Sequence, residues 1–205
     1  MNDIAAQAPD LRALFATASE QAGYSTAAQA HICGYSKQLL AHHAANGRFI
    51  RVRRGLYRLR DYPSSRHEEV MIAWLAVGRD SAVISHESAL DLHDLSDVVP
   101  NHVHLIIPRS RRGLAPMRGA ALHTEMSALS PSEIVIREGM RVTEPARTIL
   151  DCAGYGTGPE QVVMAIEQAR RRGWIVAAEF RARARERPSR VVHLVALALD
   201  TTYHP

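Results

Sequence analysis

Apolar residues near the start of the chain recur at helical spacing. Leu11, Leu14, Phe15 and Ala18 fit the i, i+3, i+4, i+7 pattern of one buried stripe. This pattern predicts a helix from Pro9 to Ala22.

The next segment carries the start and stop signals of two short helices. Thr26 and Gln29 have the spacing of a capping box, and Gly34 is a natural stop for a helix that begins there. Ser36 is a favourable N-cap for a second helix, which we expect to run to about Asn46, before Gly47. Two short helices around a glycine-containing turn are typical of a helix-turn-helix.

At about 100° per residue, the second short helix divides into two unlike faces. The residues expected to point inward are Leu39, Leu40, His43 and Ala44. The residues expected to point outward are Lys37, Gln38, Ala41, His42 and Ala45. A short polar face of this kind can enter a major groove, where glutamine can bond an adenine edge.

A basic hairpin is predicted after this helix. Two β-prone runs, Phe49–Val52 and Leu56–Leu59, flank a turn that contains Arg53, Arg54 and Gly55. Adjacent arginines at a hairpin tip suit phosphate or a narrow minor groove. Helix, helix and hairpin in this order indicate a winged helix-turn-helix that binds DNA, although the same pattern also occurs in helical segments that bind none. The predicted DNA-binding residues are Ser36, Lys37, Gln38, His42, Arg48, Arg51, Arg53, Arg54, Tyr57 and Arg58.

Residues 61–65, which lack periodicity and contain proline and serine, are interpreted as a linker. The predicted domains are therefore a winged helix-turn-helix domain at residues 1–62 and a C-terminal domain at residues 63–205.

The predicted fold class is α+β, with a mixed α/β C-terminal domain that ends in helices. Its expected helices are His67–Val77, Ser85–Leu92 with Ser85 as cap, a helix capped by Thr143 that continues to about Ala153, Pro159–Arg172, Val176–Arg187 and Arg190–Leu199. Its expected strands are Val103–Ile107, Ala121–Thr124 and a hairpin of Ile134–Ile136 with Met140–Val142.

Composition narrows the choice of partner. The net charge of +4 and the pI of about 9.4 favour a polyanionic partner. Arg109, Arg111 and Arg112 form a second candidate basic surface, with a solvated loop as the alternative. The start of the chain does not resemble a signal peptide, no apolar run approaches a membrane span, and Cys33 and Cys152 are expected to be free thiols. We therefore expect a cytoplasmic protein without a membrane partner.

An enzyme is the main alternative class for the second half of the chain. The chain contains 11 histidines, several of them between His86 and His104, but no spacing typical of a zinc site. A nuclease that needs a lysine near its metal is disfavoured, because the only lysine is Lys37. Neither the G-x-S-x-G nor the P-loop pattern occurs. The sequence therefore predicts no catalytic residues, no metal site and no cofactor, and it leaves the role of residues 86–104 open.

The chain resembles AbiEi-type antitoxins over most of its length, from about Leu11 to Leu199. The resemblance rests on the helix-turn-helix and hairpin at residues 25–59 and on three later blocks, Ala82–Leu95, His102–Gly113 and Gly139–Gly154. His43 departs from the pattern, since an aliphatic residue is expected at that position of the recognition helix.

The resemblance implies a cytoplasmic bacterial antitoxin of a type IV toxin–antitoxin system, associated with abortive phage infection. Its implied partners are a nucleotidyltransferase-like toxin, with direct contact left open, and the inverted repeats of its own operator. The alternatives are a plain winged-helix repressor with a ligand- or partner-sensing C-terminal domain and, with less support, a nucleic-acid enzyme.

Overall fold

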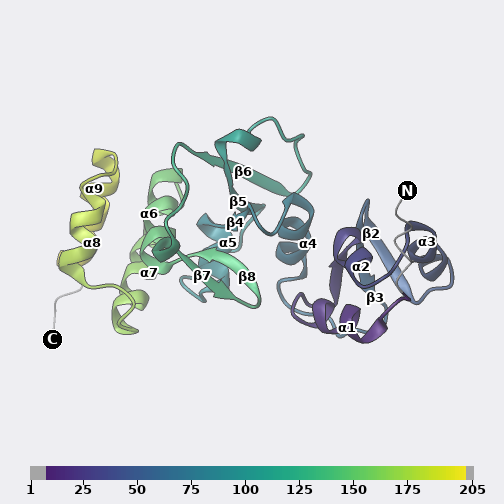
Figure 1. Ribbon diagram of the computed structural model, residues 1–205. Coiled ribbons are helices and arrows are strands. Elements are labelled where there is room, and N and C mark those ends of the chain that lie inside the picture. The colour runs from purple at the N-terminus through teal and green to yellow at the C-terminus, as the bar shows by residue number, and fades with distance from the viewer. Residues whose placement is uncertain (1–7, 202–205) are drawn as a thin grey trace. The chain divides into compact units, whose positions relative to one another are not determined.

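The computed structural model describes residues 8–201, and within them the chain divides into two compact units (Figure 1). The first unit runs up to Asp80 and also includes Glu138–Met140. The second unit contains Ser81–Arg137 and resumes at Arg141. The ends of the two predicted domains at residues 1–7 and 202–205 lie outside the described residues.

The first unit has the element order of a winged helix. Its elements are α1 (Leu11–Ser19), β1 (Tyr24–Thr26), α2 (Ala27–Ile32), α3 (Lys37–Ala45), β2 (Phe49–Arg53), β3 (Leu56–Leu59) and α4 (Glu68–Val77). The three strands form one sheet in the order β1-β3-β2. β3 is antiparallel to both neighbours, so β2 and β3 form the predicted hairpin. The core of this unit contains Leu14, Ala30, Cys33, Tyr35, Leu40, Phe49 and Tyr57.

Local signals set the ends of α1. The Asp10 carboxylate accepts a hydrogen bond from the Ala13 N–H at 3.0 Å, so this helix begins later than predicted. It ends before Ala22 and Gly23, which both have positive φ and turn the chain into β1. β1 was not predicted, because a strand of three residues shows no measurable period.

α4 belongs to the first unit by its contacts. It packs on β1 and β3, and the Arg58 guanidinium donates to the Glu68 carboxylate at 3.2 Å. Just beyond its end, Arg79 donates to the Gln21 side chain at 2.8 Å. The sequence placed this helix in the C-terminal domain, whereas the contacts place it with the winged helix. The domain boundary at residues 62 and 63 stays a prediction.

The second unit combines a mixed sheet with a helical end. Its elements are β4 (Val83–Ile84), α5 (His86–Leu92), β5 (Val103–Pro108), η1 (Arg109–Arg111), β6 (Ala120–Glu125), η2 (Pro131–Glu133), β7 (Ile134–Arg137), β8 (Met140–Thr143), α6 (Pro145–Tyr155), α7 (Pro159–Arg171), α8 (Ala177–Ala184) and α9 (Ser189–Thr201). The strand order is β6-β5-β4-β8-β7. β5 is parallel to β6 and antiparallel to β4, and β4 is parallel to β8.

Helices cover this sheet and continue beyond it. α5 packs on β5 and α6, and α9 packs on α6, α7 and α8 (Figure 1). Their core includes Leu90, Ile149, Leu150, Ile166 and Phe180. The predicted fold class is thereby confirmed: the chain is mixed α/β, with a winged helix first and helices last.

One predicted cap is wrong, and another lies at the predicted residue without a capping bond. The N-cap of α6 is Glu144, whose carboxylate accepts from the N–H groups of Ala146 and Arg147 at 2.8 and 2.7 Å. The Thr143 hydroxyl instead faces the Thr148 hydroxyl at 2.7 Å. Ser85 is the N-cap residue of α5, but its side chain makes no capping bond and contacts His86.

Candidate nucleic-acid interface

The turn before α3 sets the direction of that helix. Gly34 has a φ of 82°, a conformation that side chains with a Cβ rarely adopt. The capping box of α2 is present, with Thr26 N–H donating to the Gln29 side chain at 2.9 Å and Gln29 N–H donating to Thr26 Oγ1 at 3.2 Å. Both short helices are therefore fixed by polar contacts at their first turns as well as by packing.

The two faces of α3 match the sequence prediction. Leu40 is 2% exposed, and Leu39, His43 and Ala44 are partly buried. Every residue predicted to point outward is exposed, namely Lys37, Gln38, Ala41, His42 and Ala45. The exposed face is thus narrow, polar and free of large side chains at its centre.

His43 fills the place of an aliphatic residue. Its ring packs between Tyr35 and Phe49, with centroid distances of 5.8 and 5.1 Å. Burial lowers the pKa of His43, and the nearby Arg48 and His42 lower it further. The partly buried ring packs as an aromatic side chain beside the core, so the departure from the family pattern leaves the helix packed.

The hairpin, here called the wing (β2, the turn and β3), presents basic side chains to solvent. Arg51, Arg53 and Arg54 are exposed. Gly55, at the turn, has a φ of 74°, which allows the reversal. The wing and the outer face of α3 lie in one tract without acidic residues, because the sequence contains no Asp or Glu between Glu20 and Asp61. The arginines and the lysine of this tract therefore have no acidic neighbour within the same stretch of sequence.

Two residues predicted to bind DNA have side chains that are buried or paired within the first unit. Tyr57 is 8% exposed and belongs to the core of the first unit. Arg58 donates to the Tyr62 carbonyl at 2.7 Å and to Glu68, and it lies over the Tyr24 ring. Their side chains are engaged inside the unit because both faces of β3 are covered: Tyr57 lies in the core, and Arg58 pairs with Glu68 of α4. We therefore leave both out of the interface proposed below.

The other predicted residues are exposed. Ser36 caps α3, and Arg48 lies just before β2. The His42 imidazole lies 2.9 Å from the Asn46 amide, one turn further along, so this contact orients its ring. The surface that stays in the proposal consists of Ser36, Lys37, Gln38, His42, Arg48, Arg51, Arg53 and Arg54.

The second candidate basic surface lies in the second unit. Arg111 donates to the Ser81 hydroxyl, and Arg112 donates to the Arg109 carbonyl at 3.3 Å. Arg109 and Arg112 are exposed, while Arg111 is partly buried. Nucleic-acid binding by this segment stays a prediction.

Three histidines far apart in the sequence come together in the second unit. His86 is the first residue of α5, His104 lies on β5, and His123 lies on β6. One ring nitrogen from each lies within 4.8 Å of the other two. Burial and the neighbouring imidazoles lower the pKa of His86 to about 2 and that of His104 to about 4. We call these three residues the histidine cluster.

The histidines at residues 86–104 stood out in the sequence, whereas His123 did not. The missing signal is the parallel pairing of β5 with β6, in which His104 pairs with Ala121 and Ile106 with His123. Residues two apart on a strand share a face, so His104 and His123 are diagonal neighbours on one face of the sheet. Parallel pairing of strands this far apart cannot be read from the pattern of either strand.

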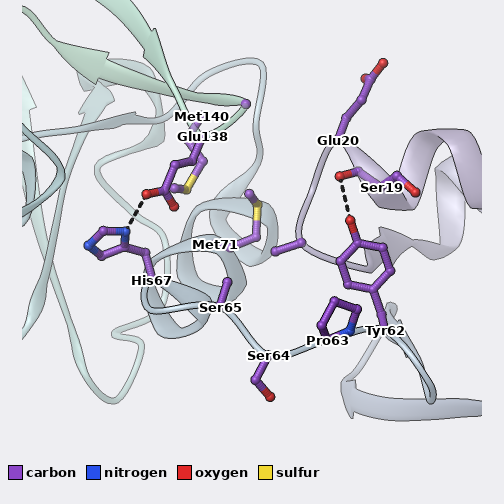
Figure 2. A pocket seen from close by; sticks show the side chains of 12 residues that line it. Ser19, Glu20, Tyr62, Pro63, Ser64, Ser65, His67, Met71, Glu138 and Met140 are labelled. Atoms are coloured by element: carbon purple, nitrogen blue, oxygen red, sulfur yellow. Dashed lines mark hydrogen bonds and ion pairs between the residues drawn. The ribbon is translucent and has the colours of Figure 1, made fainter.

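One pocket in the first unit has a cavity volume of about 510 Å³. Figure 2 shows Tyr62 and His67 among its lining residues, with the Tyr62 hydroxyl donating to the Ser19 carbonyl at 3.1 Å. His67 and Glu138 are paired at 2.8 Å. Figure 2 marks these two contacts, and the pocket adds nothing to the case for the DNA-binding surface.

Two expectations concern groups outside the interface. Cys33 and Cys152 are both buried free thiols. Among the described residues, no helix is long and apolar enough to cross a membrane.

The winged helix and its exposed basic surface define a nucleic-acid-binding regulator of the helix-turn-helix class. Residues 12–60 match the model of the family described as "Transcriptional regulator, AbiEi antitoxin". The match covers α1 to β3 and confirms the resemblance over that segment. The coarse function follows: the chain contains a regulator segment of the DNA-binding antitoxin type.

The whole chain also resembles a solved structure. The crystal structure of the RV2827C protein from Mycobacterium tuberculosis matches with a TM-score of 0.63 and 11% sequence identity. The match covers 95% of this chain and 77% of that one. At this identity the likeness shows the fold alone. No curated protein matches the chain.

Proposed function

We propose that the chain is a DNA-binding antitoxin that represses its own operon and neutralises a nucleotidyltransferase-like toxin. The observation that carries the proposal is the exposed polar face of α3 beside an arginine-tipped wing, in a segment that matches the AbiEi regulator family. Phosphate contacts supply most of the affinity of such a surface, and base contacts supply its specificity.

The geometry supports a division of roles within the surface. Gln38 is in the first turn of α3, from which recognition helices contact base edges. Lys37 lies beside it, and the wing arginines suit the backbone or the minor groove. One chain carries one recognition helix. An inverted repeat would therefore bind two copies, with half-sites about 34 Å apart.

The second unit is the candidate for the antitoxin role. The AbiEi description names an antitoxin as well as a regulator, and its match at residues 12–60 lies in the first unit. The second unit is assigned the antitoxin role because the DNA-binding surface occupies the first. Direct contact with the toxin is not required by the proposal. We further propose that the protein acts in the cytoplasm, in a type IV system that limits phage infection.

The test combines a promoter reporter with a growth assay in the same cells. The full chain is co-expressed with a nucleotidyltransferase-like toxin of the kind the proposal names. Wild type should repress the reporter and restore growth. The triple variant Gln38→Ala/Arg53→Ala/Arg54→Ala should lose repression.

The matched control is Arg12→Ala/Arg118→Ala, which removes two exposed arginines outside the surface. It should repress like wild type. Full repression by the triple variant would contradict the assignment of the surface. Growth that stays arrested in the presence of the wild-type chain would contradict the antitoxin role. Repression without rescue would favour a plain winged-helix repressor.

A further inference from the structure

The histidine cluster is held by three different elements of the second unit. His86 and His104 are buried, at 8% and 3% exposed, while His123 is half-buried. The His104 Nδ1 and His123 Nε2 atoms lie 3.0 Å apart, so the two nitrogens face each other. The His86 and His123 rings are stacked, with centroids 3.9 Å apart.

The opposite nitrogen of one ring has an oxygen partner, and that of a second has a carboxylate nearby. His86 Nδ1 lies 2.9 Å from the Ser85 hydroxyl, which leaves Nε2 as its donor atom toward the cluster. His104 Nε2 lies 4.0 Å from the Glu87 carboxylate, and Glu87 accepts a hydrogen bond from the Thr157 hydroxyl at 2.9 Å. Histidines that bind metals usually direct their other nitrogen at such an oxygen, which fixes the tautomer and the ring orientation.

We propose that His86, His104 and His123 form a binding site for one divalent d-block cation, with Zn²⁺ as the best fit. Three imidazole nitrogens and one open position are a familiar zinc arrangement, with Zn–N distances of about 2.0–2.1 Å. Tetrahedral geometry at that distance separates the nitrogens by about 3.4 Å. The three nitrogens already lie within 4.8 Å of one another. Because an imidazole binds a cation in its ring plane, His86 or His123 must turn out of their stack for both to reach one ion.

Two further features agree with a built site. His86 has a φ of 50°, a conformation that a bulky residue rarely adopts and that is enriched at functional positions. Tyr155 is 53% exposed, and its ring stands edge-on to all three imidazoles, with centroids 5.1–5.4 Å away. The half-buried His123 and the exposed Tyr155 give the cation a route from solvent.

Binding requires a change of tautomer but no net loss of a proton. Without a cation, one of the two facing nitrogens of His104 and His123 carries the proton that joins them. For both to bind the cation, that proton must move to the opposite nitrogen of its ring. On His104 that nitrogen is Nε2, next to Glu87. A bound cation would join α5, β5 and β6 and should stabilise the second unit.

The test uses the full chain after treatment with a chelator, followed by equilibrium dialysis against Zn²⁺ alone. Wild type should retain one zinc per chain, and its unfolding midpoint should rise with zinc concentration. His123→Ala, the least buried of the three, should lose the zinc and the rise. His102→Ala is the matched control: His102 is exposed and outside the cluster, and its variant should bind like wild type.

Cobalt gives a readout that does not depend on a variant folding. Co²⁺ added to the wild-type chain should produce the visible absorption of a tetrahedral site, and Zn²⁺ should displace it. Wild type that retains no zinc and gives no cobalt spectrum would overturn the proposal. Equal zinc in wild type and folded His123→Ala would also overturn it, because the metal would then bind elsewhere.

Discussion

The Ser36 hydroxyl accepts a hydrogen bond from the Leu39 N–H at 3.1 Å, and this contact fixes where α3 begins. Because the helix starts at Lys37, Leu40 points into the core while Lys37 and Gln38 point to solvent. One capping bond therefore fixes both which residues of α3 pack in the core and which ones form the proposed DNA-binding face.

Gln38 should contribute specificity more than affinity. A good bidentate base contact is worth about 1–3 kcal/mol of discrimination. Gln38→Ala should therefore bring operator binding closer to random-DNA binding, with little change on random DNA. Competition binding on both DNAs measures this. Equal losses on the two would show that Gln38 only positions the helix.

The wing arginines should contribute affinity without specificity. Arg53 and Arg54 are exposed at the tip of the hairpin, where they suit phosphate contacts. Replacing both with Ala should weaken binding to every sequence and reduce the salt slope by about one per lost phosphate contact. The slope is measured by titration at several salt concentrations. An unchanged slope in a folded variant would remove the wing from the interface.

The first unit should need α4 for full stability. α4 packs on β1 and β3, and its Trp74 is fully buried. Burial of one large apolar side chain contributes about 1.5–3 kcal/mol. A fragment of residues 1–80 should therefore be more stable in urea than a fragment of residues 1–62 by at least about 2 kcal/mol. Identical unfolding curves would support the shorter boundary predicted from the sequence.

Arg147 should be a stability residue of the second unit. Its guanidinium pairs with Asp151 at 2.7 Å and also with Glu125 and Glu133. Loss of one partner of a buried ion pair costs about 3–5 kcal/mol, because the other charge stays buried. Arg147→Ala should destabilise the chain by that amount in urea unfolding.

The control for Arg147 is Arg181→Ala. Arg181 pairs with the exposed Asp200, and surface pairs contribute about 0–1 kcal/mol. A small loss for both variants would show that the carboxylates around Arg147 find other partners.

The sequence predicted α2, α3 and the hairpin because each carries its own local signals. The capping box at Thr26, the cap at Ser36 and the glycines that end the helices all act within a few residues. β1 and β4 were missed because they contain three and two residues, and both exist only through pairing with distant strands. The Glu144 cap was also missed, since Thr143 offered an equally good signal one residue earlier.

The surface residues were predictable on the helix and less so on the strands. The period of α3 places its outward residues without further information. On β3, Leu56 and Tyr57 are both buried although successive strand residues point to opposite faces. One face packs on the core and α4 packs on the strand as well, so the sequence of β3 alone could not show that Tyr57 and Arg58 are both engaged inside the unit.

DNA binding by the intact chain tests the central claim most directly. Fluorescence anisotropy should compare a labelled fragment of the chain's own promoter with a shuffled fragment of equal length and composition, at one salt concentration. Specific binding typically exceeds non-specific binding by at least about 10³-fold, and we expect a preference of that order for the promoter. Equal affinity for the two fragments would contradict the account, since the exposed face of α3 would then read no sequence.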